Sequence, residues 1–313
     1  MSSVTTPVTV PEKTRVASGA AASRRKWRKY LPMYLSIAPY YIVFLAFGII
    51  PVIFSLYLAF QKWDGIGKMT FVGWNNFTSA LTDPIFGQAI LNTFIIWIIS
   101  TIPMLAIGLV LAFLINMRKR SKFAYQVAFF LPNVTSTVAI ALIFGAMFSP
   151  QFGLFNLILN ALHIPSIQWT TDAWPMKWAV ALMVIWQWTG YNALVYMAGL
   201  QSIPTDFYES ARLDGANTWG IFYHITLPLL RPIVLFTVIS STLGGMTIFT
   251  QPQVLFGDNG GPGNAGLTMS LYNYWQSFAS FHFGFGAAVS WILFFILVIF
   301  TLVNWRIVQH GDK

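Results

Sequence analysis

Long uncharged stretches alternate with short charged ones along the chain. Six segments contain no Asp, Glu, Lys or Arg: 30–61, 84–117, 123–171, 178–205, 232–257 and 259–305. Each exceeds the roughly 20 residues that a helix needs to cross the hydrocarbon core of a bilayer. Backbone polar groups in that core must bond within their own segment, so these segments are predicted to be helices.

Two of the uncharged segments are long enough to suggest extra spans. Residues 150–165, however, are too short and too polar to cross, and residues 268–281 suit an interfacial helix better. The pattern therefore predicts an all-α polytopic membrane protein with six transmembrane helices inside a domain of residues 30–310. The predicted spans are 35–60, 89–115, 123–148, 178–200, 230–255 and 284–305.

Composition and charge agree with a membrane protein. Hydrophobic residues make up 56% of the chain and charged residues only 9%, too few to cover a water-facing surface. The net charge of +9 does not indicate nucleic-acid binding, because 15 of the 18 basic residues gather at the termini and in alternate loops, and only Lys62, Lys68 and Lys177 lie in the others. By the positive-inside rule, both termini are expected in the cytoplasm of a bacterial inner-membrane protein.

Residues 1–29 are predicted to be a disordered, basic cytoplasmic tail, because the first 23 residues are rich in Ser, Thr, Ala, Val and Pro without apolar periodicity. A cleavable signal peptide is not expected, since the first apolar run is too long and no small-residue cleavage site follows it. The absence of cysteine excludes disulfides and thiol chemistry but does not fix the compartment.

The sequence carries no recognisable signature of catalysis. The chain has no G-x-x-x-x-G-K-[ST] stretch for binding ATP phosphates. Its four histidines have no metal-ligand spacing. No predicted span holds Asp, Glu, Lys or Arg in its interior, and the paired carboxylates expected of a proton-coupled transporter are missing. We therefore predict that the chain is not an enzyme, holds no cofactor, and passes a neutral solute with energy from another subunit.

The loop between the fourth and fifth predicted spans, residues 201–228, has the pattern of an ordered helical pair. Pro204 and Thr205 are expected to start a helix there, with Thr205 or Asp206 as its N-cap. Gly215 can adopt the left-handed conformation that ends a helix, and a second amphipathic stretch is expected to stop at Pro228. The pattern alone indicates two short helices at the membrane surface.

This loop resembles the "EAA" motif of permease subunits of binding-protein-dependent ABC importers. The matching residues are Glu209, Ala211, Asp214, Gly215 and Ala216, then Ile225, Leu227 and Pro228, with Ser210 where the family often has Ala. Other stretches look like the sugar-class, maltose-permease-like members: FVGWNNF (71–77), Asn92-Thr93-Phe94, FFLPNVTSTVAIALIF (129–144) and GGPGN (260–264). The resemblance covers roughly residues 35–305 and implies a type I importer fold.

The resemblance also implies partners. Residues 206–220 would form a coupling helix that docks on a cytoplasmic ATPase, present in two copies that bind ATP and Mg²⁺. Contacts to it are expected from Glu209, Ser210, Ala211, Asp214, Gly215 and Ala216. A second, similar permease would share the translocation path, and an extracytoplasmic sugar-binding protein would dock on the loop from Gly257 to Phe283. The alternative is an ordinary amphipathic helix at the membrane surface.

A polar and aromatic cluster interrupts the predicted fourth and fifth spans. On the fourth, Gln187, Trp188, Tyr191 and Asn192 follow Val184 on one helix face. Glycine and proline interruptions on the fifth span are typical of a transporter binding cavity. The sugar-binding candidates are Gln187, Trp188, Gly190, Tyr191, Asn192, Gly244, Thr247 and Gln251. The alternative is that these polar groups join helices through hydrogen bonds.

The sequence therefore predicts the permease subunit of an ATP-driven importer of a neutral di- or oligosaccharide. The resemblance favours cellobiose- or lactose-like sugars over maltose or trehalose. One rival is a secondary carrier or channel that works alone, against which the uncharged spans and the ordered loop argue. Another is a membrane enzyme acting on lipid-linked sugars, which would need clustered acidic or histidine groups that the sequence lacks.

Overall fold

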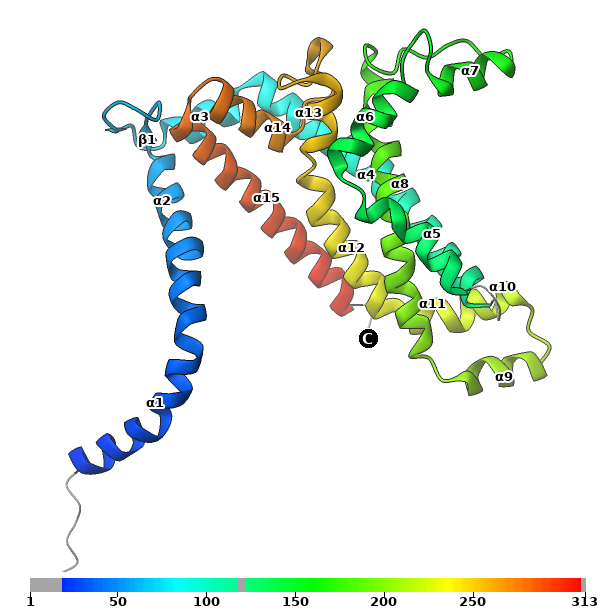
Figure 1. Cartoon of the computed structure of the whole chain (residues 1–313), viewed down its shortest axis with the longest axis horizontal. Helices are drawn as coiled ribbons and strands as arrows, with labels where there is room; N and C mark the ends of the chain where they lie inside the picture. The colour runs from blue at the N-terminus through cyan, green and yellow to red at the C-terminus, as the bar shows by residue number, and fades with distance from the viewer. Residues whose placement is uncertain (1–18, 118–121, 311–313) are drawn as a thin grey trace, which may run out of the picture. The chain divides into compact units, whose positions relative to one another are not determined.

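The computed structural model describes residues 19–117 and 122–310, and its secondary structure is almost entirely helical (Figure 1). Within these ranges the β-structure is one antiparallel hairpin, in which β1 (Gln61–Lys62) pairs with β2 (Thr70–Phe71). The predicted helical class is confirmed apart from this hairpin. The chain divides into two units, residues up to Ser55 and residues from Leu56 onward, which are described separately.

The first unit is one long helical segment. It comprises α1 (Gly19–Phe44), the π-helical turn η1 (Leu45–Ile49) and the start of α2 (Ile50–Ala59). Residues 19–29 were predicted to be disordered but are helical, since Ala, Arg and Lys in this stretch are strong helix formers. Residues 1–18 of the predicted tail lie outside the described residues. The hydroxyl of Ser36 donates to the carbonyl oxygen of Pro32, 2.8 Å away, so its polar group is satisfied within the helix.

The second unit contains the remaining helices. Before the loop of residues 201–228 they are α3 (Asn75–Thr82), α4 (Pro84–Asn116), α5 (Lys122–Val134), α6 (Thr137–Met147), α7 (Leu154–Ala161) and α8 (Ala173–Gln201). After it they are α9 (Thr205–Leu213), α10 (Thr218–Ile221), η2 (Phe222–Thr226), α11 (Leu227–Leu229), α12 (Arg231–Met246), α13 (Thr250–Phe256), η3 (Pro262–Asn264), α14 (Met269–Tyr274), η4 (Trp275–Ala279) and α15 (Phe283–His310).

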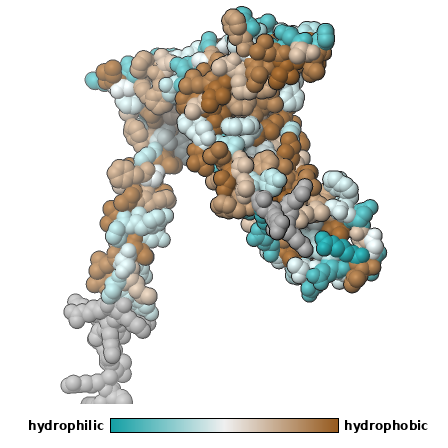
Figure 2. Space-filling model, turned by 45° about the vertical axis from the view of Figure 1, so that its right-hand side comes forward, coloured by the Kyte–Doolittle hydropathy of each residue, from teal (hydrophilic) through white to brown (hydrophobic). Residues whose placement is uncertain are grey.

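Helix α8 is the centre of the second unit. It packs along α4, and α5, α6 and α12 also contact it. The largest buried cluster joins Ile96 and Met104 of α4, Ile140 of α6, and Val180 and Met183 of α8. In Figure 2, hydrophobic residues form a broad band between hydrophilic ones at the two ends of this unit.

Four helical segments among the described residues are long and apolar enough to cross a membrane: Tyr30–Ala59, Pro84–Asn116, Arg231–Phe256 and Phe283–Asn304. The pair α5 and α6 would make a fifth span if it counts as one. Helix α8 has 29 residues but lies outside this set, because polar and tryptophan residues interrupt its apolar sequence. The predicted number of six spans therefore stays a prediction.

The predicted third span, 123–148, is not one straight helix. Helices α5 and α6 meet at an angle of 92° across Thr135 and Ser136. Pro132 has no N–H to donate to the carbonyl four residues before it. Ser136 has the extended backbone of a residue that starts a new helix (ψ 129°). The bend is thus encoded by the Pro-Asn-Val-Thr-Ser sequence.

A glycine allows α5 to contact the backbone of α8. A Cβ atom added to Gly190 would lie 1.7 Å from the carbonyl oxygen of Phe129. We therefore expect Gly190→Ala to destabilise the protein by about 1–3 kcal/mol through overpacking and to lower its melting temperature in detergent. Gly87→Ala, where an added Cβ meets no atom within 4 Å, is the matched control. Equal melting temperatures for the two variants would contradict this close approach.

Candidate functional site

The site begins where a membrane helix is interrupted. Helix α12 ends at Met246, α13 begins at Thr250, and the three residues between them are not helical. Pro252 has no N–H to donate to the carbonyl of Ile248, and the hydroxyl of Thr268 donates to that carbonyl instead at 2.7 Å. The hydroxyl of Thr247 donates to the carbonyl of Leu243 at 2.9 Å. Side-chain hydroxyls thus bond two of the carbonyls at the break.

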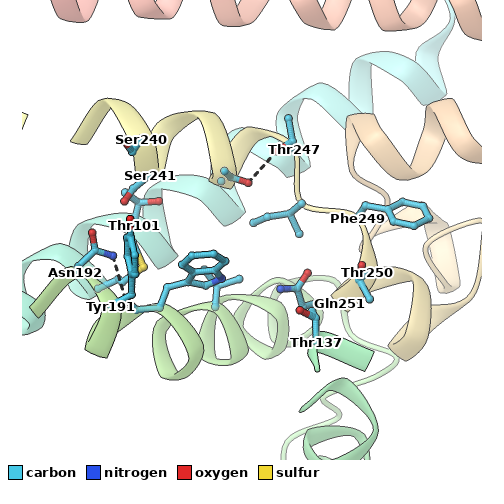
Figure 3. A pocket seen from close by; sticks show the side chains of 16 residues that line it. Thr101, Thr137, Tyr191, Asn192, Ser240, Ser241, Thr247, Phe249, Thr250 and Gln251 are labelled. Carbon is cyan, nitrogen blue, oxygen red and sulfur yellow. Dashed lines mark hydrogen bonds between the residues drawn. The ribbon is translucent and has the colours of Figure 1, made fainter. Parts of the chain in front are cut away.

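A cavity of about 340 Å³ lies beside this break, within the second unit (Figure 3). Its walls come from α4, α6, α8, α12 and α13 together with the break itself. The lining residues are Thr101, Met104, Thr137, Val184, Trp188, Tyr191, Asn192, Ser240, Ser241, Gly244, Gly245, Thr247, Ile248, Phe249, Thr250 and Gln251. Its volume lies in the range typical of small-molecule sites.

Most of the predicted sugar-binding residues line this cavity. They are Trp188, Tyr191 and Asn192 of α8, and Gly244, Thr247 and Gln251 of the interrupted helix. The structure therefore brings together two faces that the sequence predicted separately. Whether they bind sugar stays a prediction.

Two predicted residues do not line the cavity. Gln187 is buried, and its Nε2 atom donates to the hydroxyl of Thr137 at 3.1 Å, so it lies one side chain away from the cavity. Its Oε1 atom is buried without a hydrogen-bond partner among the described residues. Gly190 contacts the backbone of Phe129 instead. Both residues thus hold the bent pair of α5 and α6 against α8.

The cavity has uncharged polar groups and aromatic walls. None of its lining residues is Asp, Glu, Lys, Arg or His. The rings of Trp188 and Tyr191 meet edge to face, with their centroids 5.8 Å apart. Gln251 is only 6% exposed, and no described residue hydrogen bonds to its amide. In Figure 3 the Gln251 side chain lies beside Thr137 at one end of the cavity.

Sequence reasoning missed the polar lining from other helices. Thr101 comes from α4, Thr137 from the start of α6, and Ser240 and Ser241 from α12. Hydroxyl pairs inside an apolar span were a usable signal, since Ser240 and Ser241 lie one turn before Gly244. Met104, Phe249 and Thr250 gave no comparable signal.

The predicted coupling segment has the expected helix, glycine turn and second helix. Gly215 has a φ of +82°, which confirms the predicted left-handed conformation. The backbone N–H of Ala216 donates to the carbonyl of Ala211 at 2.9 Å and that of Gly215 to Arg212 at 3.1 Å, the hydrogen-bond pattern of a Schellman motif. Gly215 is needed at this position because an L-residue there would be strained.

Two details of the coupling segment were predicted wrongly. The N-cap of α9 is Pro204, without a side-chain hydrogen bond, and Thr205 and Asp206 are already helical. Asp206 in the first turn still suits the positive end of the helix dipole. The second stretch is not halted at Pro228 but continues through η2 and α11 to Leu229, because a proline is tolerated at the start of a helical turn.

The coupling candidates lie at the surface. Glu209, Ser210, Asp214, Gly215 and Ala216 are exposed, and Ala211 is half-buried. Apolar side chains are exposed beside them, with Leu213 89% and Trp219 55% accessible. The opposite side of α9 packs through Tyr208 against the cluster of α4, α8 and α12. The segment is thus fixed to the membrane helices and presents a mixed charged and apolar face.

The loop between α13 and α14, residues 257–268, is ordered by side chains of α4. Asn92 is buried, and its Nδ2 atom donates to the carbonyl oxygens of Asn264 (2.9 Å) and Leu267 (3.0 Å). The backbone N–H of Met269 donates to the Thr93 hydroxyl at 2.9 Å. These contacts give a physical role to two of the residues that carried the family resemblance.

In α14, which follows this loop, the phenol of Tyr272 donates a hydrogen bond to the carboxylate of Asp83. Burial and the negative charge of Asp83 raise the pKa of Tyr272 well above its ordinary value, so the phenol keeps its proton. Asp83 also caps α4 by accepting from the N–H of Ile85 at 2.8 Å. The loop and the start of α4 therefore form one ordered surface.

The family model described as "Binding-protein-dependent transport system inner membrane component" matches residues 93–309. The chain belongs to this family. The predicted membership is confirmed, and the protein is a permease of the ABC-importer type with several membrane helices.

Several named permeases are similar to this one over nearly their whole length. The lactose transport system permease LacF of Rhizobium radiobacter is 34% identical over 291 residues, which cover 91% of this chain and 97% of LacF. The arabinooligosaccharides permease AraP of Bacillus subtilis is 34% identical, covering 92% and 93%. The trehalose/maltose permease MalF of Thermococcus litoralis is 30% identical, covering 91% and 96%.

The fold also matches a solved structure. A chain of a bacterial ABC transporter involved in the import of the acidic polysaccharide alginate superimposes with a TM-score of 0.78 at 22% identity. The match covers 93% of this permease and all of that chain. At this identity the likeness shows the fold alone, and it supports the ABC-importer permease architecture.

The contacts of Asn92 lead to a specific prediction. Asn92→Ala removes a side-chain donor from two carbonyl oxygens, of which the one of Asn264 keeps the backbone N–H of Leu267 at 3.1 Å and the buried one of Leu267 loses its bond to Asn92. The lost bond at Leu267 costs about 1–3 kcal/mol locally. Hydrogen exchange of the backbone amides in residues 263–269 should therefore accelerate. Asn75→Ala, at an exposed asparagine at the start of α3, is the matched control and should leave this exchange unchanged. Unchanged protection in both variants would show that other contacts hold the loop.

Proposed function

We propose that this permease moves a neutral di- or oligosaccharide into the cytoplasm through the cavity beside the broken helix. The observation that carries the proposal is the meeting of uncharged polar groups and aromatic rings between membrane helices. Amides and hydroxyls bond sugar hydroxyls, and the rings of Trp188 and Tyr191 offer faces for a pyranose ring. A lining without charged side chains suits a neutral solute better than an ion.

The names of the relatives support a sugar without fixing which one. They include permeases for lactose, arabinooligosaccharides and trehalose/maltose. Another relative, SmoG of Agrobacterium fabrum, is named for sulfoquinovosyl glycerol, and the solved neighbour imports acidic alginate. Because no cationic side chain lines the cavity, we favour a neutral sugar for this permease. Cellobiose- or lactose-like disaccharides are the first to test.

The assembly that we propose is the one that the resemblance to the ABC-importer permeases implies. A second permease would complete the path, two cytoplasmic ATPase subunits would bind ATP and Mg²⁺, and an extracytoplasmic sugar-binding protein would deliver the sugar. The stretch from Gly257 to Phe283 is the proposed receiver of that protein. The hydrogen bonds of its first part, residues 257–268, to α4 support an ordered docking surface. A solved relative has been crystallised with a periplasmic protein that holds an alginate pentasaccharide.

The coupling role is proposed for residues 206–220, with both chain termini on the same, cytoplasmic side. The support is the exposed face with Glu209 and Asp214, together with the direct passage from α9 through α10, η2 and α11 into α12. Helix α12 ends at the cavity. A displacement of residues 206–220 by the ATPase would therefore be transmitted to the cavity through this helix. The basic loop of residues 118–121 lies outside the described residues and adds no argument.

The cavity assignment is tested with two tryptophans of the same helix. Trp188 lines the cavity, whereas Trp186 lies on another face of α8 and packs against Phe144, with centroids 5.6 Å apart. Trp188→Ala should remove a contact to the sugar worth about 1 kcal/mol and therefore slow uptake roughly fivefold. It should also change the preference among cellobiose, lactose and maltose, whereas Trp186→Ala should keep that preference.

A second matched pair removes amides from α13. Gln251→Ala should alter sugar preference, and Gln253→Ala, at a residue that bonds Asp258 outside the cavity, should not. The ATPase activity stimulated by the loaded receptor protein should survive at least in part in both. If the cavity variants instead lose thermal stability with unchanged sugar preference, these side chains only join helices and the site assignment fails.

The coupling role is tested at Gly215 and Glu209. A β-branched residue in the left-handed conformation costs roughly 1–2 kcal/mol, whereas asparagine tolerates it. Gly215→Val and the charge reversal Glu209→Lys should therefore reduce sugar uptake strongly, and Gly215→Asn should transport almost normally. Insertion in the membrane and binding of the loaded receptor protein should persist in all three. Normal uptake by Gly215→Val and Glu209→Lys would mean that residues 206–220 form an ordinary helix at the membrane surface with no coupling role.

A further inference from the structure

The break between α12 and α13, residues 247–249, joins two different hydrophobic clusters. Ile248 is buried in the cluster that contains residues of α4, α6 and α8. The next residue, Phe249, packs instead against the cluster formed by residues of α3, α4, α14 and α15. Both residues line the cavity. The break is therefore the point at which the cavity wall meets the part of the protein that carries the loop of residues 257–268.

Thr268, the last residue of this loop, bonds the break directly. Its side chain is fully buried, and its hydroxyl donates to the carbonyl of Ile248 at 2.7 Å. The same oxygen accepts from the backbone N–H of Leu271 at 3.3 Å, so Thr268 is also the N-cap of α14. One hydroxyl thus uses its proton for the break and a lone pair for α14.

A second contact joins α14 to the break. The rings of Phe249 and Tyr274 have centroids 5.1 Å apart. Phe249 has a backbone outside the helical region (φ −134°, ψ −57°), so its ring is directed by this packing and not by a regular helix. Thr268 and Tyr274 stand at the two ends of α14. Helix α14 therefore holds two consecutive residues of the cavity wall, one by a hydrogen bond and one by ring packing.

The loop before α14 is tightly built and is attached to α4. The backbone N–H of Gly266 donates to the carbonyl of Gly260 at 2.9 Å, and a Cβ atom added to Gly266 would lie 2.3 Å from the ring of Phe256. Asn92 and Thr93 of α4 bond the residues on either side of Thr268. Residues 257–259 and 262–263 are exposed. Because the interior of the loop is close-packed, a displacement of its exposed part is passed to Thr268.

We propose that Thr268 is a positioning residue that transmits docking of the sugar-binding protein from this loop to the cavity wall. The inference rests on the proposed function, since it assumes that the stretch from Gly257 to Phe283 receives that protein. A shift of the docked loop moves the Thr268 hydroxyl and, through it, the carbonyl of Ile248. Phe249 follows through the ring of Tyr274. Thr268 itself does not line the cavity and touches no sugar.

The link to the break is tested by hydrogen exchange on the purified, assembled transporter in lipid nanodiscs, without sugar or sugar-binding protein. Thr268→Val keeps the shape of the side chain and removes the hydroxyl. Exchange in peptides covering residues 247–256 should accelerate about tenfold, the effect of losing one buried hydrogen bond. Thr268→Ser, which keeps the hydroxyl, should restore wild-type exchange.

Thr242→Val is the matched control for this variant. Thr242 is buried in α12, and its hydroxyl donates within its own helix to the carbonyl of Val238 at 2.7 Å. Removing that hydroxyl leaves the break untouched, so exchange over residues 247–256 should stay at the wild-type rate. Equal exchange in Thr268→Val and Thr242→Val would overturn the proposed link.

Transmission is tested by titrating the same transporter with the loaded sugar-binding protein and measuring ATPase activity. Thr268→Val should lower the maximal stimulated rate about tenfold. It should leave the half-saturating concentration of sugar-binding protein unchanged, because the exposed part of the loop is intact. Thr268→Ser and Thr242→Val should both behave as wild type. If Thr268→Val does not assemble, Tyr274→Leu removes the second contact and should show the same separation of rate from affinity.

Two further results would contradict a transmitting role. Faster exchange confined to α14 would mean that Thr268 only caps this helix. A lower stimulated rate with an equally raised half-saturating concentration would mean that Thr268 shapes the docking surface instead.

Cross-linking separates this inference from the proposed docking. The chain has no cysteine, so Asp258→Cys, at an exposed position of the loop, provides a single attachment point in this chain. Cross-linking to the sugar-binding protein together with unchanged stimulation in Thr268→Val would reject transmission and leave the docking assignment standing. No cross-linking would reject the docking assignment and the transmission with it, whereas the exchange result at the break requires neither partner.

Discussion

Every break in a membrane helix leaves backbone groups that must find partners inside the protein, because hydrocarbon offers none. In this permease that constraint explains where the cavity lies. Pro252 frees the carbonyl of Ile248, and the hydroxyl of Thr268 bonds it at 2.7 Å. Thr247 bonds the end of α12 with its own hydroxyl. These side-chain bonds replace two of the helical ones, so the carbonyls of Leu243 and Ile248 stay bonded where the helix opens beside the cavity.

The same bonds connect the cavity to the loop of residues 257–268. Thr268 lies between Leu267, whose carbonyl accepts from Asn92, and Met269, whose N–H donates to Thr93. The carbonyl that Thr268 bonds belongs to Ile248, a cavity-lining residue. A partner that displaced this loop would therefore remove a hydrogen bond from the cavity wall itself. Helix α4 and residues 257–268 are far apart in the sequence, and together they position the hydroxyl that bonds the Ile248 carbonyl.

The sequence predicted the parts of this arrangement that depend on local pattern. The face with Trp188, Tyr191 and Asn192 follows from helical periodicity, and the conformation of Gly215 follows from the need to end α9. The bend at Ser136 was missed because residues 123–148 were judged by their lack of charge and their length, although Pro132 and the polar residues after it mark the break. Thr101 and Ser240 were missed because periodicity gives the face of one helix but not the helices that it meets.

Gln187 and Gly190 show why a residue can belong to a site without lining it. Both lie on α8 close to the cavity face, and both contact α5 or α6 instead. Gly190 sets how closely α5 approaches, and the amide of Gln187 holds Thr137, which does line the cavity. The position of the Thr137 hydroxyl therefore depends on the amide of Gln187 and on the bend between α5 and α6. A polar helix is tolerated here because α8 is surrounded largely by protein, so its amides meet hydroxyls and carbonyls rather than hydrocarbon.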